Sequence, residues 1–288
     1  MASKSVQKTF IVGEEWLYYK IYCGVKTADS VLIEVLQPFC EDLLEKQLID
    51  KWFFIRYSDP NPHLRVRFHV VKNENLSIVI TQIKVLIMPF INSKQVWDIT
   101  LGTYKRELER YGKYTIELSE SFFYYDSQKS ITIIENAEDD TARFLMVFKW
   151  VEYLVSLFRL NTQDQLSFLK QMQSSFKAEF KTDKTVTKEL NLKYKSLDTE
   201  LSSNRNKNQI ANSELELELE LELEQIINNL LKLHQQNLLE VSLSDLLSSY
   251  IHMSINRTFR SKQRLYEMMI YAFLHKKNQS KFARYGKL

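Results

Sequence analysis

Histidine and arginine side chains occupy every second position from His63 to His69, and both residue types could do chemistry. The preceding run, Trp52-Phe-Phe-Ile-Arg-Tyr57, is aromatic and β-branched, and Ser58-Asp-Pro-Asn-Pro62 is rich in turn residues, so two strands joined by a tight turn are predicted. On the second strand, alternation separates a charged face from an apolar one: His63, Arg65, Arg67 and His69 against Leu64, Val66, Phe68 and Val70. Because burying unpaired charge is costly, the charged face is either solvent-facing surface or the floor of a site for an anion.

Three more places in the chain carry groups of the same chemical kind. Arg56 lies in the first of the two strands, Thr103-Tyr-Lys-Arg-Glu-Leu-Glu-Arg-Tyr-Gly112 supplies Arg106, Glu107 and Arg110, and a helical stretch near the end supplies His252 and Asn256. The planar fork of arginine binds carboxylates or an enolate, and histidine moves protons near neutral pH. Each segment alone is more often a solvated strand face, an ion-paired helix turn or an ordinary histidine. Spacing does not show that the segments meet, so the residues themselves indicate only a possible anion site.

Composition excludes several classes of protein. A net charge of +3 over 288 residues gives no support to direct nucleic-acid binding. Cys23 and Cys40 form neither a metal spacing nor a disulfide framework, which fits a reducing cytoplasm. The start of the chain lacks the apolar run of a signal peptide. The apolar segment Phe144–Leu160 contains three charges, so it predicts a core helix and no membrane span.

The pattern along the chain predicts an α+β fold, with an N-terminal mixed β-sheet and flanking helices packed on a C-terminal helical layer. We expect one domain over residues 1–288, with a mixed α/β half at 1–140 and a mainly helical half at 141–288. Apolar spacing predicts a helix over residues 28–47 that breaks at Pro38, and another over 76–91. The later helices are expected at residues 142–158, 163–180, after Ser242 with Asp245 as a capping partner, and 264–276.

Residues 202–224 form a low-complexity segment. We expect a loop at 202–208, followed by the strict Glu-Leu alternation of residues 214–224. Alternation is a strand pattern, but Leu and Glu are strong helix formers, so we interpret this run as a repeat expansion within a surface helix or its leading loop, without chemistry.

Four motifs occur in the order found in one family: Trp52–Phe68, Thr103–Gly112, Glu120–Ser127 and Ile251–Arg257. The chain resembles the C-terminal, glutamate-elimination domain of class I lantibiotic dehydratases, also called the thiopeptide-type bacteriocin biosynthesis domain. The similarity extends over roughly residues 16–282, and between about 160 and 240 it is limited to helical character. In that family a separate domain attaches glutamate from glutamyl-tRNA to Ser or Thr of a precursor peptide, and the elimination domain removes it to leave dehydroalanine or dehydrobutyrine.

The resemblance implies a stand-alone subunit of a split dehydratase, a lyase that works with a separate glutamylation subunit on a glutamylated ribosomal precursor peptide. By motif position, the catalytic residues carried over are Arg65, Arg67, Arg110 and His252, with Glu107 as an orienting ion-pair partner. Arg56, Arg106 and Asn256 are expected to bind substrate. The arginines are assigned to the glutamyl and enolate groups and His252 to proton transfer, whereas the residue that takes the Cα proton stays open. The resemblance implies no metal and no organic cofactor. A homodimer is also expected as one possibility, because relatives often self-associate.

Two other functions are weighed against elimination. The first is a pyridine-forming cycloaddition enzyme of thiopeptide pathways; such relatives generally lack the full arginine set, so its retention here favours elimination. The second is a non-catalytic peptide-binding subunit, which would accept a leader peptide by adding a strand to a sheet edge.

Overall fold

The computed structural model describes residues 6–202 and 214–285, and these form two compact units. The first comprises Met1–Asn136, Lys232–Leu246 and Asn256–Ser261, and the second comprises Ala137–Leu231, Leu247–Ile255 and Lys262–Leu288. Each unit is treated separately below. The loop expected at residues 202–208 lies almost entirely outside the described residues.

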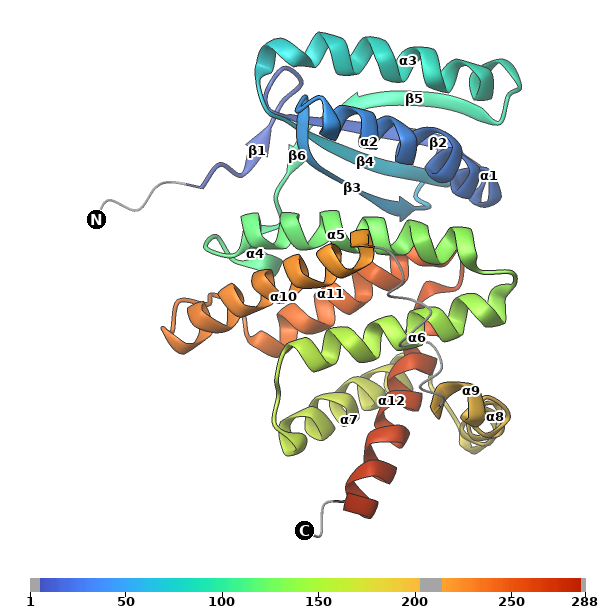
Figure 1. Ribbon diagram of the computed structural model, residues 1–288. Helices are drawn as coiled ribbons and strands as arrows, with labels where there is room; N and C mark the ends of the chain where they lie inside the picture. The colour runs from blue at the N-terminus through green and yellow to red at the C-terminus, as the bar shows by residue number, and fades with distance from the viewer. Residues whose placement is uncertain (1–5, 203–213, 286–288) are drawn as a thin grey trace. The chain divides into compact units, whose positions relative to one another are not determined.

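The first unit is built on a four-stranded sheet of order β3-β4-β2-β5 (Figure 1). The strands are β2 (Trp16–Cys23), β3 (Ile49–Tyr57), β4 (His63–Val70) and β5 (Val96–Gly102). All three pairings between them are antiparallel, so the expectation of a mixed sheet is wrong in strand direction, although the α+β class is confirmed. Short strands β1 (Thr9–Phe10) and β6 (Tyr104–Lys105) form a separate antiparallel pair.

Helices supply the rest of the first unit's core. They are α1 (Val25–Ser30), a π-helical segment η1 (Val31–Leu36), α2 (Gln37–Glu45), the 3₁₀ turn η2 (Asn73–Asn75), α3 (Leu76–Asn92), α4 (Leu108–Tyr111) and α5 (Ile116–Asn136). The predicted helix 28–47 is thus present, and its irregular part lies just before Pro38, where the proline occupies the first turn of α2. One apolar cluster joins β2, β3 and β4 to η1, α2, α3 and α5. It contains Leu64, Val66, Phe68 and Val70, the predicted apolar face of β4.

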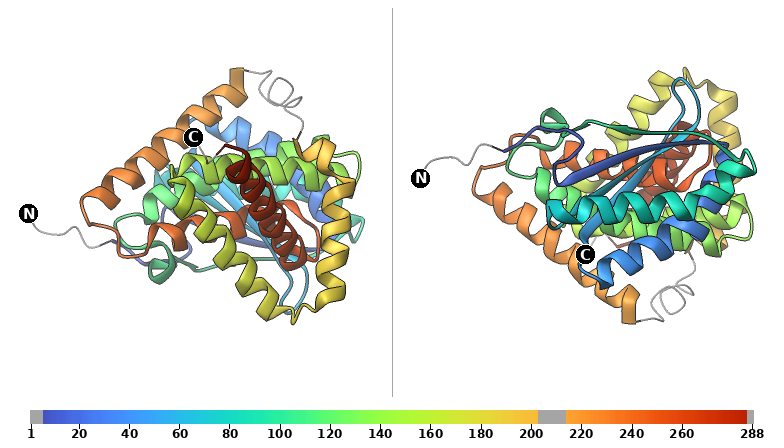
Figure 2. Two further views of the ribbon diagram at one scale, coloured as in Figure 1. Left: turned by 90° about the horizontal axis from the view of Figure 1, so that it is seen from below. Right: turned by 90° about the horizontal axis from the view of Figure 1, so that it is seen from above.

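The second unit is helical in its described part. Its elements are α6 (Asp140–Leu157), α7 (Thr162–Glu179), α8 (Lys184–Ser196), α9 (Asp198–Ser202), much of α10 (Glu214–Gln235), the middle of α11 (Leu243–Thr258) and α12 (Gln263–Tyr285) (Figures 1 and 2). Aromatic contacts pack α12 on its neighbours: Tyr271 lies 5.7 Å from Phe176, and Phe273 lies 5.7 Å from Phe144, between ring centroids.

The predicted start of α11 agrees with the structure, whereas the predicted end of α12 does not. The Ser242 hydroxyl accepts a hydrogen bond from the backbone N–H of Asp245 and donates one to its carboxylate, which confirms the cap of α11. The final helix continues to Tyr285, well beyond the expected end at 276.

The Glu-Leu run is helical, as expected, and its leucines divide between two stripes of α10. Leu219 and Leu223 are buried, whereas Leu217 and Leu221 are exposed. Residues four apart share a helical face, so the repeat supplies one core stripe and one solvent stripe.

Candidate active site

Arg67 sits at the centre of the sheet, on the face opposite the apolar cluster. Strand register places it between Tyr18 of β2 and Phe53 of β3. Its guanidinium carbon lies 4.6 Å from the Tyr18 ring centroid, 5.2 Å from that of Phe53 and 4.9 Å from that of Tyr104. Three aromatic rings therefore surround one cation, an arrangement in which ring electrons favour positive charge.

The charge of Arg67 is buried, with only 8% of the residue exposed. Its Nε is fully buried and has no hydrogen-bond partner among the described residues, and no described carboxylate forms an ion pair with it. Burial lowers the pKa of Arg67, and the neighbouring Tyr104, Tyr18 and Glu107 act in the opposite direction. Of the two alternatives from the sequence, plain solvent-facing surface does not hold for this side chain. A buried guanidinium fork without a carboxylate is suited to binding an anion.

Arg65 lies on the same face, two residues along β4 and half-buried. Its guanidinium carbon lies 3.5 Å from the Tyr57 ring centroid, and its Nε donates to Nε2 of His63 over 3.1 Å. Nδ1 of His63 is 2.7 Å from the carbonyl oxygen of Asn61, so a neutral imidazole with its proton on Nδ1 satisfies both contacts. Burial lowers the pKa of His63, and the nearby charge of Arg65 acts in the same direction.

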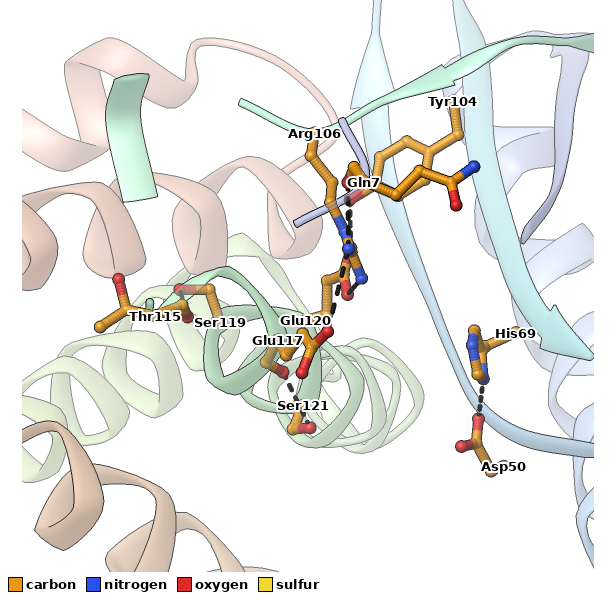
Figure 3. Close-up of polar contacts among 10 residues, drawn as sticks. All are labelled: Gln7, Asp50, His69, Tyr104, Arg106, Thr115, Glu117, Ser119, Glu120 and Ser121. Atoms are coloured by element: carbon orange, nitrogen blue, oxygen red, sulfur yellow. Dashed lines mark hydrogen bonds and ion pairs between the residues drawn. The ribbon is translucent and has the colours of Figure 1, made fainter. Parts of the chain in front are cut away.

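The segment from Tyr104 to Gly112 contributes its residues in two different ways. Arg106 is buried in a bidentate pair with Glu120 of α5, with Nε–Oε1 at 2.8 Å and Nη2–Oε2 at 2.7 Å, and also reaches the carbonyl oxygen of Gln7 (Figure 3). Tyr104 donates its hydroxyl proton to Oε1 of Glu120. The Arg106–Glu120 ion pair thus fixes the position of the Tyr104 ring, which packs against the Arg67 guanidinium.

Arg110 and Glu107 are nearer solvent. They form the predicted i,i+3 contact, at 3.7 Å. Burial raises the pKa of Tyr111 to about 12; Arg110 and Arg67 act to lower it, and Glu107 acts to raise it. All three charged side chains are therefore close enough to the Tyr111 ring to affect its ionisation. Gly112 ends α4 with a φ of 75°, a conformation that side-chain-bearing residues rarely adopt, so the glycine sets the turn after Arg110.

Arg56 and Asn256 occupy different positions from Arg65 and Arg67. Alternation along β3 places Arg56 on the opposite face of the sheet, where it contacts Asp29 and donates to the carbonyl oxygen of Arg257 over 2.7 Å. The Asn256 amide bonds both backbone groups of Arg56, at 2.9 and 3.0 Å. The structure does not bring these two side chains together with Arg65 and Arg67, and their expected role in substrate binding stays a prediction.

His252 lies in the second unit, where α12 supports it. Its Nδ1 is 2.9 Å from Oε2 of Glu267, a buried carboxylate that also receives Nη1 of Arg264 at 2.8 Å. Arg264 in turn pairs with Glu179. With Nδ1 directed at a carboxylate, Nε2 is the ring nitrogen free to exchange a proton.

The structure therefore gathers Arg65, Arg67, Glu107 and Arg110 in one unit and gives His252 an orienting partner in the other. Sequence reasoning missed Tyr18, Tyr104 and Glu267. The alternation of β2 could have placed Tyr18 beside the arginines, whereas nothing local indicates that Glu267 meets a histidine fifteen residues earlier. His69, also on the charged face of β4, contacts Asp50 at the sheet end (Figure 3). Among the described residues, no cluster of three His, Cys, Asp or Glu side chains has a metal-binding arrangement.

Comparison with known proteins gives related sequences and folds. Subtilin biosynthesis protein SpaB of Bacillus subtilis is 29% identical over 185 residues, 59% of this chain and 17% of that protein. Nisin biosynthesis protein NisB of Lactococcus lactis subsp. lactis is 31% identical over 44% of this chain and 13% of that protein. Epidermin biosynthesis protein EpiB of Staphylococcus epidermidis is 26% identical over 89% of this chain and 25% of that protein.

Two solved structures share the fold. The tRNA-dependent lantibiotic dehydratase MibB of Microbispora sp. 107891 matches with a TM-score of 0.69 and 18% identity, over 94% of this chain and 29% of that one. The pyridine synthase TbtD from thiomuracin biosynthesis matches with a TM-score of 0.66 and 11% identity, over 94% of this chain and 99% of that one. At these identities the likeness concerns the fold alone.

The chain spans a quarter or less of the length of the three curated relatives. The sequence family described as the C-terminal part of the lantibiotic biosynthesis dehydratase matches residues 16–277, nearly the whole chain. The four motifs, the α+β fold and this match lead to one conclusion: the protein belongs to the lantibiotic biosynthesis dehydratase C-terminal family.

Proposed function

We propose that this chain is a lyase that eliminates glutamate from glutamylated Ser or Thr residues of a ribosomal precursor peptide. The observation that carries the proposal is Arg67, a buried guanidinium without a carboxylate partner inside a box of three aromatic rings. Its neighbour Arg65 adds a second cation on the same sheet face. Two fixed cations suit a substrate that is itself an anion and develops further negative charge during reaction.

The proposed reaction breaks two bonds and forms one π-bond. A base removes the Cα proton of the esterified residue, the electron pair forms the Cα–Cβ double bond, and the Cβ–O bond breaks to release glutamate. Carboxylate is a far better leaving group than hydroxide, which explains why the hydroxyl is first esterified. Arg67 and Arg65 stabilise the enolate-like charge and the departing glutamate, and Arg110, oriented by Glu107, binds a glutamyl carboxylate.

His252 is the proposed proton-transfer residue. Glu267 accepts from Nδ1, so the neutral ring presents the Nε2 lone pair for proton transfer. The proposed setting is the cytoplasm, where precursor peptides are made, with the glutamyl group supplied by a separate glutamylation subunit.

The test is mass spectrometry of a synthetic peptide with a glutamyl ester on Ser, incubated with the purified chain. We expect free glutamic acid and a dehydroalanine peptide from the wild type and unchanged ester from Arg67→Met and His252→Ala. An ester that persists with wild-type protein, both alone and together with a glutamylation subunit, would refute elimination.

A second candidate is supported by one comparison. This chain covers 99% of the pyridine synthase TbtD, a protein of similar length, so a pyridine-forming cycloaddition is the alternative. A peptide that already carries dehydroalanine residues separates the two. Ring formation from that peptide, with no action on the glutamyl ester, would favour the alternative.

A further inference from the structure

An arginine bridges two carboxylates beside His252 in the second unit. Nη1 of Arg264 donates to Oε2 of Glu267 over 2.8 Å, and its Nε donates to Oε1 of Glu179 over 3.1 Å. Nη2 of Arg264 pairs with the other oxygen of Glu179. The same Oε2 of Glu267 lies 2.9 Å from Nδ1 of His252. The contacts therefore form one series, in the order His252, Glu267, Arg264 and Glu179.

Burial differs along this series. Only 2% of the Glu267 side chain is exposed, whereas the side chains of Arg264 and Glu179 are 46% and 43% exposed. The Glu267 charge is felt inside the unit: burial raises the pKa of Tyr271, Glu267 acts in the same direction and Arg264 opposes it. The series therefore leads from a buried carboxylate to two charges at the surface, where solvent and salt reach them.

Helix polarity does not explain where Arg264 and Glu179 lie. Arg264 is the second residue of α12, near the positive end of that helix dipole, and Glu179 is the last residue of α7, at a negative end. Each charge is thus at the less favourable end of its own helix. The ion pair between them compensates for this, as does the Phe176 ring, whose centroid lies 4.3 Å from the guanidinium carbon of Arg264. The pair therefore outweighs the preference of each helix end.

The sum of charges around His252 shows what the two outer residues do to its ring. Glu267 and Glu179 carry two negative charges and Arg264 one positive, so the three together favour a protonated ring. Without Arg264 the excess of negative charge doubles, and without Glu179 it vanishes. Glu179 is within electrostatic reach, because the hydrogen bond from Arg264 lowers the pKa of Glu179 and the charge of His252 acts in the same direction. Among the described residues, no other ionisable side chain forms an ion pair or hydrogen bond with His252, Glu267 or Arg264.

We infer that Arg264 and Glu179 set the protonation state of His252, with Arg264 favouring the neutral ring and Glu179 the protonated one. Neither forms a hydrogen bond with the ring, so both are positioning residues and not catalytic ones. The functional meaning of the inference rests on the proposed role of His252 in proton transfer. A group that gives and takes a proton works best when it titrates near the working pH, and two surface charges of opposite sign adjust that titration.

The first measurement is the pH titration of the His252 ring by NMR of protein with labelled histidine. The chain has five histidines, and the signal missing from His252→Ala identifies the right one. We expect Arg264→Met to raise the pH of the titration midpoint by about 0.5–1 unit and Glu179→Gln to lower it by about 0.5 unit, since solvent screens the two exposed charges. Arg264→Lys keeps the positive charge and should stay within about 0.3 unit of the wild type.

Lys281→Met is the matched control. It removes a positive charge from the same helix, α12, but Lys281 lies 3.5 Å from Glu152 and 58% of its side chain is exposed, so the His252 midpoint should not move. Midpoints of Arg264→Met and Glu179→Gln that shift in the same direction, or that both match the wild type, would overturn the inference. If circular dichroism shows that Arg264→Met does not fold, Glu179→Gln decides alone, and an unchanged or higher midpoint in that variant rejects the inference.

The pH dependence of elimination separates this inference from the proposed function. If neutral His252 takes up a proton during elimination, the acidic limb of the kcat/KM profile for the glutamyl ester should move with the NMR midpoint, upward in Arg264→Met and downward in Glu179→Gln. Opposite NMR shifts in a protein that eliminates no glutamate would support the inference and refute the proposed function. Elimination with an acidic limb that stays in place while the midpoint moves would also support the inference, and it would assign the proton transfer to a residue other than His252.

Discussion

Replacement of Arg67 by methionine tests whether this arginine serves substrate or structure. Desolvation of a buried guanidinium costs several kcal/mol, and three desolvated cation–π contacts return about 1–2 kcal/mol each. The two amounts nearly cancel, and methionine keeps most of the apolar contact of the arginine stem. We therefore expect Arg67→Met to change the free energy of unfolding by no more than about 1 kcal/mol, in either direction. Elimination should fall by about 10²–10³-fold, as when a donor to a developing anion is lost.

The matched control is Arg257→Met. Arg257 is a buried arginine like Arg67, but its Nη1 lies 2.7 Å from Asp126 and its Nε donates to the Phe54 carbonyl. Its removal takes away the cation that faces the buried carboxylate of Asp126, which costs about 3–5 kcal/mol. Urea unfolding followed by tryptophan fluorescence reports mainly on the first unit, which contains Trp16, Trp52 and Trp97 of the four tryptophans. If Arg67→Met destabilised the protein as much as Arg257→Met, Arg67 would be a structural brace and the anion-site argument would fail.

Three further predictions concern the surroundings of the site. Burial lowers the pKa of His63, so as the pH falls below about 6.5 the unfolded chain takes up a proton before the folded one, and the free energy of unfolding declines. His63→Gln should reduce this dependence of unfolding free energy on pH between pH 7.5 and 5.5, measured by urea unfolding, and an unchanged dependence would contradict the prediction. Glu267→Gln removes the charge beside His252 and should lower kcat about 5–30-fold with KM within about twofold, through loss of about 1–2 kcal/mol; a change in KM alone would assign Glu267 to substrate binding instead. Glu120→Ala removes the carboxylate that pairs with buried Arg106 and should lower the free energy of unfolding by about 3–5 kcal/mol. Adding Arg106→Met to this variant should restore much of the loss, and a double variant without recovery would show that the unpaired arginine does not cause the destabilisation.

Strand periodicity is the part of the site that could be predicted from sequence. Alternation with a period of two is local and depends on few assumptions, so the faces of β4 were assigned correctly. The partners of the arginines could not be assigned in this way. Arg106 pairs with Glu120 fourteen residues away and Arg56 with Asp29 twenty-seven residues away, and such contacts depend on tertiary packing rather than on spacing.

The apolar segments show the same limit. Phe144–Leu160 is the most apolar stretch of the sequence, and the structure forms the core helix α6 there, as expected. Among the residues that the structure describes, the segment that meets the length and composition of a membrane span is instead Asn73–Asn92. Its exposed side also carries large apolar residues, among them Ile78, Val85 and Leu86, so composition alone does not reveal which side packs on the sheet.

The positions of the side chains on the charged face of β4 depend on the burial of the apolar face of the same strand. Leu64, Val66 and Phe68 are fully buried, and a slip of β4 by one residue would exchange them with the arginines and expose the core. Burial of these three side chains thus fixes the register that holds Arg67 between the rings of Tyr18 and Phe53. The same register holds Arg65 against the ring of Tyr57. A substitution such as Val66→Ala should therefore weaken the site through positioning as well as through the cavity that it creates. Core packing and the proposed anion site are two consequences of one alternating sequence.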